Sequence, residues 1–342
     1  MTDMMELMQV LCALDGVSGY EDGVREAIEG MIAPHVEEMT VDAMGSLIAL
    51  KKGARAPARR LMVCAHTDEV GMLVFRITDE GLLKFVPVGT LDPRVLLGQR
   101  VRIGERRLPG VVAVKAIHLT SEAEKKISPP IDALYIDIGA RSKKEAASHV
   151  RVGDPVMFDN EPGAFGEGRF RGKAIDDRLG CAVMVSLIRG NIPFDTWFAF
   201  STCEEVGLRG ASALTERVRP DMTLVLEGTS AGDMPSVRPD LRATRQGAGA
   251  VVSVADGGTV YNREVIEKMT CAADAAGIPW QPRSGMGGRT DSGSIHVRAG
   301  GSLTFGVSAP TRYIHSANNV VYMPDAKAVL DLTALFIATM GE

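Results

Sequence analysis

The stretch Thr196-Trp-Phe-Ala-Phe-Ser-Thr-Cys-Glu-Glu-Val-Gly207 is an apolar run that ends in two adjacent glutamates, Glu204 and Glu205. Its aromatic and β-branched residues predict a buried strand. A carboxylate at the end of such a strand is costly to bury unless cations or hydrogen bonds compensate its charge. Because side chains alternate in direction along a strand, the two glutamates can reach different partners around one pocket. One can then bind a metal while the other moves protons, although an isolated Glu-Glu pair is more often a solvated acidic turn.

Strands and helices alternate on both sides of this stretch, which predicts an α/β sheet with helices on both faces. A hairpin is expected over residues 38–42 and 46–51, and Ser18 and Glu21 have the spacing of a capping box before the second N-terminal helix. The other predicted strands cover residues 60–66, 196–202, 222–226, 250–255 and 302–307. The predicted helices cover two segments within residues 4–36 and residues 177–189, 210–217, 262–276 and 326–339.

Residues between about 70 and 160 have a different sequence pattern, in which short segments of alternating apolar and polar residues are separated by turns. Such closely spaced strands predict a small β-barrel or sandwich. We therefore expect one α/β domain, made of residues 1–69 and 164–342, that carries an inserted β domain over residues 70–163. The charged segment 121–127 is predicted to be a surface excursion of the insertion.

The composition limits the classes of function that need to be considered. The chain has 342 residues and is 45% hydrophobic and 24% charged, as is usual for a globular protein. Its net charge of −5 argues against nucleic acid as the main partner. No apolar stretch approaches the roughly 18 residues that span a bilayer, and the acidic N-terminus lacks the basic region of a secretion signal. The five scattered cysteines are interpreted as reduced core residues of a cytoplasmic protein.

Several acidic residues and histidines follow the predicted strands. His66 ends one apolar run and is followed by Asp68, while Glu227 ends the run Thr223-Leu-Val-Leu-Glu. Asp176 and Asp177 precede a helix, where one of them could simply be its N-cap. His315 lies in a polar loop after a strand, where binding residues are common.

These residues are predicted to meet, because ligands of open α/β sheets bind at the carboxyl ends of the strands. Two histidines with several carboxylates suit zinc, cobalt or manganese better than a thiolate site would. Five protein ligands exceed the three that one catalytic zinc normally uses. A centre of two divalent metal ions with a shared carboxylate accounts for the surplus.

At these residues the chain resembles the family-42 metallo-aminopeptidases, the tetrahedral aminopeptidases. The matching segments cover residues 65–71, 172–178, 203–211 and 311–316, with two more at 115–120 and 134–140 inside the insertion. The resemblance implies a mixed-sheet peptidase domain with an inserted barrel-like domain that makes dimer contacts. It also implies assembly into homododecameric tetrahedra and short peptides as substrates.

The resemblance also implies a role for each site residue. Asp176 would bridge two metals, His66 would belong to one of them, and Glu205 with His315 to the other. Glu204 would be the general base, and Asp68 would orient His66. The family usually has Asp at the last ligand position, where this chain has Glu227.

Two other functions remain open from the sequence. Paired carboxylates also serve glycoside hydrolases, although that chemistry does not usually need metal-binding histidines. A non-catalytic assembly protein could keep the metal site for stability, and the unusual Glu227 is compatible with that role. The segment Gly285-Met-Gly-Gly lacks the strand–helix context of a nucleotide-binding loop.

The preferred N-terminal residue of a peptide substrate is not determined by these patterns. Arg245, Arg283 and Arg289 are possible partners for an acidic side chain, although an arginine taken singly is more often solvated or in a subunit contact.

Overall fold

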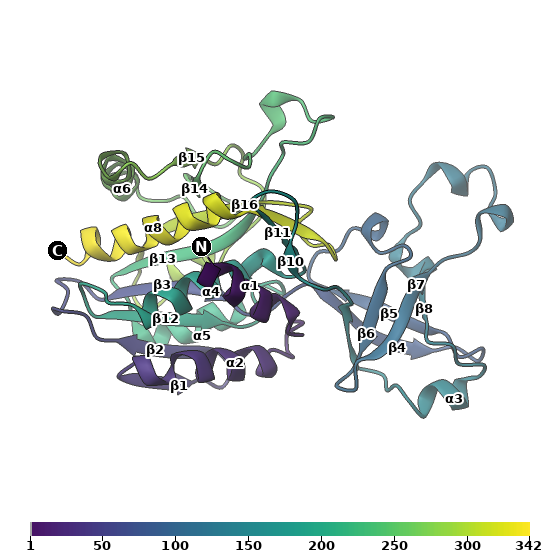
Figure 1. Ribbon diagram of the computed structural model, residues 1–342. Coiled ribbons are helices and arrows are strands. Elements are labelled where there is room, and N and C mark those ends of the chain that lie inside the picture. Colours follow the sequence, from purple (N-terminus) through teal and green to yellow (C-terminus); the bar gives the residue numbers. More distant parts are fainter. Residues whose placement is uncertain (1) are drawn as a thin grey trace.

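The computed structural model describes residues 2–342 and divides the chain into a large α/β part and a smaller β part that projects from it (Figure 1). The large part contains an 11-stranded sheet with the main strand order β1-β2-β12-β3-β13-β16-β17-β11-β10, while β14 pairs with β16 and β15. Its strands are β1 (Glu38–Val41), β2 (Leu47–Lys51), β3 (Leu61–His66), β10 (Gly163–Ala164), β11 (Arg169–Gly172), β12 (Thr196–Ser201), β13 (Met222–Ser230), β14 (Ala250–Val252), β15 (Trp280–Pro282), β16 (Leu303–Arg312) and β17 (Asn319–Tyr322).

The centre of this sheet is parallel and its margins are antiparallel. Strands β12, β3, β13 and β16 run in the same direction, whereas β2 and β17 run against their neighbours. The register places Ser201 beside His66 at the carboxyl ends of β12 and β3. The mixed sheet confirms the predicted fold class and brings four chain segments to one edge.

Helices cover both faces of the sheet because the central strands are apolar on both sides. Successive residues of β3 enter different cores: Val63 packs in the larger cluster with helices α1, α2, α4 and α8, and Met62 packs in the smaller one with α5 and α7. The bounds of these helices and of α6 are α1 (Thr2–Ala13), α2 (Asp22–Ile32), α4 (Ile175–Arg189), α5 (Arg209–Val218), α6 (Arg263–Ala276), α7 (Ser292–Ile295) and α8 (Met323–Met340).

The inserted part is a closed barrel with the strand order β4-β5-β8-β7-β6-β9. Its strands are β4 (Gly71–Ile77), β5 (Leu83–Val88), β6 (Arg100–Ile103), β7 (Leu108–Ala113), β8 (Tyr135–Asp137) and β9 (Pro155–Phe158), and helix α3 (Lys143–Ala147) lies at one end. The barrel has its own apolar core, which includes Met72, Val101 and Ile136. The predicted insertion is therefore confirmed, while its limits at residues 70 and 163 stay a prediction.

Three details of the sequence-based prediction are wrong. Ser18 and Glu21 form no capping box, because helix α2 has no side-chain cap and the Ser18 hydroxyl donates to Asp68 instead. Strand β13 does not end at Leu226 but continues to Ser230, since it pairs with β16 along its whole length. Cys271 is exposed and Cys203 is only partly buried, so the five cysteines are not all core residues.

Two buried cations fix helix α1 against the sheet edge. Lys173 donates to the Leu14 carbonyl at 2.6 Å and to Glu69 at 2.5 Å. Arg178 donates to the carbonyls of Leu11 at 2.6 Å and Thr67 at 3.0 Å. Cations that satisfy the last carbonyls of a helix stabilise its end. They also join α1 to the segment that follows His66 and to the start of α4.

Within residues 2–342, no helix combines the length and apolar character needed to cross a bilayer. The predicted compartment stays a prediction.

Replacing a core phenylalanine of the central strand tests this packing. Phe200 of β12 is fully buried in the larger core, so Phe200→Ala should lower the free energy of unfolding by about 3–5 kcal/mol through lost burial and the cavity left behind. Denaturant titration followed by the fluorescence of Trp197 and Trp280 measures this change. The control Phe165→Ala, at a side chain that is 48% exposed, should cost less than about 1 kcal/mol. Equal losses in both variants would contradict the assigned core.

Candidate metal centre

A cavity of about 650 Å³ opens at the carboxyl edge of the central strands. The acidic residues that line it are Asp176, Glu204, Glu205 and Glu227, and His315 lines it with them. They come from the turn after β12, from β13, from the start of α4 and from the loop between β16 and β17, and His66 lies beside them at the end of β3. Residues far apart in the sequence therefore meet in one place, as the strand-end pattern predicts.

Asp176 lies between the two histidines. Its Oδ1 is 3.4 Å from Nε2 of His66, and its Oδ2 is 3.6 Å from Nε2 of His315. The Gly228 amide also donates to Oδ1, at 2.9 Å. Each oxygen of this carboxylate thus faces a different imidazole.

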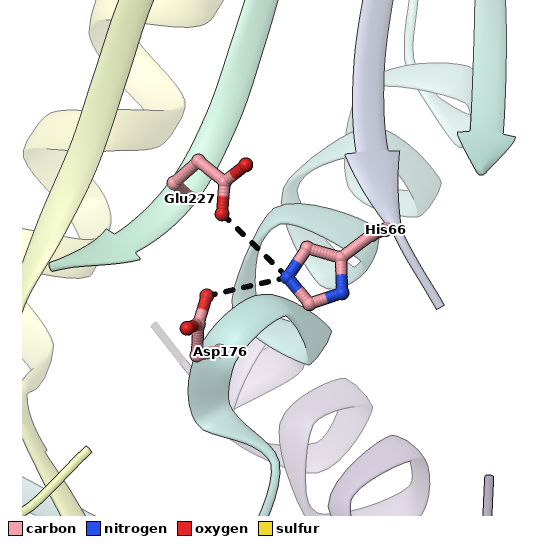
Figure 2. Close-up of side chains that lie close together, drawn as sticks. All are labelled: His66, Asp176 and Glu227. Atoms are coloured by element: carbon pink, nitrogen blue, oxygen red, sulfur yellow. Dashed lines mark ion pairs between the residues drawn. The ribbon is translucent and has the colours of Figure 1, made fainter. Parts of the chain in front are cut away.

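Each histidine has a second carboxylate beside it. Glu227 Oε2 is 3.5 Å from Nε2 of His66, and Figure 2 shows this nitrogen facing both Asp176 and Glu227. Glu205 Oε1 is 3.3 Å from Nε2 of His315. The side chains thus form two groups that have Asp176 in common. One group adds His66 and Glu227, and the other adds Glu205 and His315. Within each group the possible ligand atoms lie within 4.8 Å of one another.

Hydrogen bonds at Nδ1 orient both imidazoles. Nδ1 of His66 lies 3.1 Å from the Asp68 carbonyl oxygen and 3.3 Å from its carboxylate. Nδ1 of His315 lies 3.0 Å from the Thr90 carbonyl oxygen. Because oxygen acceptors face Nδ1 in both rings, the tautomer with the proton on Nδ1 leaves the lone pair of Nε2 directed at the carboxylates.

Asp68 also holds the turn that carries the two glutamates. Its carboxylate accepts the amide hydrogens of Glu204 at 3.0 Å and Glu205 at 3.1 Å, and the Ser18 hydroxyl at 2.6 Å. Cys203, just before the pair, has a positive φ of 54°, which is a strained backbone for a residue with a side chain. These contacts fix the direction in which Glu204 and Glu205 leave the strand.

The neighbouring aspartates have separate roles in the structure. Asp176 and Asp177 have non-helical backbone angles within α4, and Asp177 accepts the Gly180 amide hydrogen at 3.0 Å, so it caps the regular part of the helix that follows. Asp176 faces the histidines instead. The peptide bond between them is cis.

The pKa shifts of the glutamates and of His315 indicate that the cluster has too little positive charge for its carboxylates. Burial raises the pKa of Glu204 well above its usual range, and Glu227 and Asp291 raise it further, whereas His66 opposes the shift. Burial also raises the pKa of Glu227 and Glu205, although His66 and His315 oppose it. Burial lowers the pKa of His315, but Asp176 and Glu205 outweigh it and raise the value to about 10. The pKa values of these three glutamates and of His315 are thus all raised, as expected where buried carboxylates outnumber their cationic partners.

The donor atoms fit divalent cations. Nε2 of His66, Oε1 of Glu205 and Oε1 of Glu227 are buried and make no hydrogen bond within the part of the chain that the structure describes. Such atoms are costly to leave unpaired, and a cation would satisfy them. Imidazole nitrogen and carboxylate oxygen are ligands of zinc, cobalt and manganese.

Some residues around the centre were missed by the sequence reasoning. Thr90 belongs to the inserted barrel and reaches the centre only through the fold. Asp291 is almost fully buried and accepts a hydrogen bond from Ser201, and burial raises its pKa to about 6. Neither residue has a neighbouring sequence pattern that signals its position.

An α/β sheet with an inserted barrel and a buried histidine–carboxylate centre at its carboxyl edge defines a metallo-aminopeptidase, a hydrolase of peptide bonds. The chain belongs to the M42 glutamyl aminopeptidase family, whose pattern matches residues 45–332.

Full-length relatives agree with this assignment. A TET aminopeptidase from a marine sediment thaumarchaeote is 35% identical, with a TM-score of 0.93 over 98% of this chain and 96% of that chain. The TET1 peptidase of Pyrococcus horikoshii, which can assemble into a tetrahedron or a large octahedral shell, is 30% identical, with a TM-score of 0.86 over 98% and 99% of the two chains. The lysyl aminopeptidase of Pyrococcus furiosus is 31% identical over 98% of this chain and 96% of its own length.

Removing one imidazole tests the metal centre. His315→Ala leaves Asp176 and Glu205 without their nitrogen partner, so the metal retained per subunit after dialysis should fall by about half or more. Metal analysis of the dialysed protein measures this loss. The control His149→Ala removes an exposed histidine of the barrel and should retain the wild-type amount. Full metal content in His315→Ala would exclude this histidine as a ligand.

Proposed function

We propose that the chain releases N-terminal residues from short peptides by means of a centre of two divalent metal ions and a glutamate base. The observation that carries the proposal is the position of Asp176, whose two oxygens face the Nε2 atoms of two different histidines. A carboxylate in this position suits a bridging ligand, with one oxygen for each ion.

In this proposal each ion has its own ligands besides Asp176. His66 and Glu227 hold one ion, and Glu205 and His315 hold the other. Zinc or cobalt is the expected metal, and manganese is compatible with the same donors. Bound divalent ions would acidify a water molecule and polarise the scissile carbonyl group.

Glu204 is assigned the proton transfers. It has no ion pair with either histidine among residues 2–342, in contrast to Glu205, yet it lies within reach of the centre together with His66 and Glu205. Its burial raises the pKa of its carboxyl group, which suits a group that accepts a proton from the attacking water and returns it to the leaving amine. Asp68 positions this base through its hydrogen bond to the Glu204 amide.

The charge of the cavity supports exopeptidase specificity. The free α-amino group of a peptide is a cation, and the four carboxylates that line the cavity lie around the two histidines. An internal peptide bond has no such cation to offer. Binding of the amino group to these carboxylates would place the first peptide bond beside the centre.

Glu227 is the residue at which this chain differs from the expected family pattern. Its side chain is one methylene longer than Asp, yet Oε2 lies 3.5 Å from Nε2 of His66, which is about as close as Asp176 comes. This geometry supports a ligand role for Glu227. The longer side chain reaches the centre from a position inside strand β13.

Replacement of the proposed base should separate metal binding from catalysis. Glu204→Gln removes the proton acceptor but keeps the size of the side chain, so metal content should persist while kcat falls by about 10²–10⁴. Rates on aminoacyl p-nitroanilides and metal analysis of the same samples measure both effects. The exposed control Glu264→Gln should leave both unchanged.

Wild-type rates in Glu204→Gln would remove this residue from the mechanism. Chelation of the wild-type protein separates the other candidate functions. Hydrolysis of cellulose that survives chelation would indicate a glycoside hydrolase, and metal-loaded protein without turnover on any aminoacyl substrate would indicate a non-catalytic assembly protein.

We further propose that the barrel mediates assembly into dimers and a tetrahedral dodecamer. The P. horikoshii relative assembles into such shells, and the barrel of this chain projects from the α/β domain (Figure 1). It also exposes large apolar side chains that water would disfavour on a free surface, namely Phe75, Val111, Ile117, Leu119 and Ile127.

A charge placed on the barrel tests this assembly. Phe75 is 62% exposed, so Phe75→Glu should leave the fold intact and shift the protein to smaller species, since burying a carboxylate in an interface is costly. Light scattering during gel filtration measures the change. The control Val10→Glu, on the exposed side of α1, should keep the wild-type mass. A monomeric wild-type protein would contradict the proposal.

A further inference from the structure

Glu21 is a buried carboxylate that the proposed mechanism does not use. Its side chain is almost inaccessible to water, and burial raises the pKa of its carboxyl group. Its backbone starts helix α2, because its carbonyl oxygen accepts the Arg25 amide hydrogen at 3.0 Å, but its side chain does not cap that helix. Helix capping therefore does not explain why this costly side chain is buried.

The side chain of Glu21 instead contacts the turn that carries the proposed base. Its Oε1 accepts the amide hydrogen of Cys203 at 3.0 Å, and Sγ of Cys203 lies 3.5 Å from the same oxygen. The next two amides, those of Glu204 and Glu205, donate to Asp68 at 3.0 Å and 3.1 Å. Three consecutive amide hydrogens of the turn are therefore bound by two buried carboxylates.

The carbonyl groups of the same turn are bound by the segment that follows it. The carbonyl oxygens of residues 202–204 accept amide hydrogens from residues 207–210, over distances of 2.9–3.2 Å. These hydrogen bonds are local, because they lie within the turn and the start of α5. The amide groups depend instead on two side chains that are distant in the sequence, at positions 21 and 68.

Cys203 needs such a partner because its backbone conformation is unfavourable. Its φ of 54° lies in the left-handed region, which is disfavoured for a residue that has a Cβ. Cys203 directly precedes Glu204, so a change in its φ would turn the glutamate that follows. A hydrogen bond to a carboxylate is roughly twice as strong as one between neutral groups, and the bond to Glu21 therefore opposes this change.

We propose that Glu21 is a positioning residue for the general base, because it holds Cys203 in the left-handed conformation and so directs the side chain of Glu204 at the metal centre. The inference rests on the proposed function, since it needs Glu204 to be the base. Glu21 does not line the cavity and acts through the backbone of Cys203. Such an indirect contact matters because a displacement of about 1 Å at a catalytic group can lower the rate by about 100-fold.

Two uncharged replacements of similar size test this role in the metal-loaded protein. Glu21→Gln keeps an acceptor oxygen for the Cys203 amide, so its kcat on aminoacyl p-nitroanilides should stay within about threefold of the wild type. Glu21→Met has no such oxygen, so its kcat should fall by about tenfold or more while KM and metal content stay unchanged. The control Glu26→Met replaces an exposed carboxylate of the same helix and should keep the wild-type rate. Glu21→Ala gives the same comparison if Glu21→Met does not fold.

A double-mutant cycle tests whether the effect passes through Cys203. Glycine adopts a positive φ without steric cost, so in a Cys203→Gly background Glu21→Met should lower kcat by about threefold or less. Cys203→Ala also removes the thiol but keeps the Cβ, so the loss of about tenfold should remain in that background. Equal losses in the two backgrounds would overturn the inference, and so would equal rates of Glu21→Gln and Glu21→Met.

Amide hydrogen exchange separates this inference from the proposed function, because it needs no turnover. Glu21→Met should speed exchange over residues 202–206 by about tenfold, while residues 26–32 of α2 should exchange as in the wild type. Faster exchange in α2 as well would indicate that Glu21 only stabilises the helix, which would overturn the inference. Unchanged exchange and rates in Glu21→Met, together with loss of activity in Glu204→Gln, would overturn this inference alone and leave the base assignment intact.

Discussion

Carboxylates that are removed from water dominate the carboxyl edge of the central sheet. Asp68, Asp176, Glu204 and Glu227 are all buried, and the last three line one cavity. Burial of this much negative charge is costly unless hydrogen bonds and cations compensate it. Much of the surrounding structure provides these hydrogen bonds and cations. Backbone amides, for example, donate to Asp68 and Asp176.

The protein compensates the charge of Asp68 more completely than the charges of Glu205 and Glu227. Asp68 accepts two backbone amides and a hydroxyl, and the pKa of its carboxyl group is lowered despite burial, chiefly through His66. Glu205 and Glu227 keep buried oxygens without partners. Asp68 therefore belongs to a rigid frame whose hydrogen bonds are all supplied by the chain. Glu205 and Glu227 instead offer free oxygens that match external cations. Buried Lys173 and Arg178 extend the frame to helix α1.

The inserted barrel is tied closely to this centre. It begins five residues after His66, and its Thr90 carbonyl contacts Nδ1 of His315. At Gly89, a Cβ would lie 3.3 Å from Cβ of Glu205, so the loop after β5 approaches the metal-binding side chains closely. A domain that was predicted only to mediate assembly therefore also orients a candidate ligand. Displacement of the barrel would change the direction of that imidazole.

The sequence by itself determined the element types, the insertion and the seven candidate residues at strand ends and loops, because apolar periodicity and residue chemistry are local properties. Tertiary structure decided how those residues pair. In the fold, Asp176 lies beside the histidines, whereas Asp177 caps a helix. Ser18 donates to Asp68 and does not cap a helix as expected. The fold also brought Thr90 and Asp291 to the centre. Contacts between residues that are distant in the chain depend on strand order and register, and no local pattern encodes those.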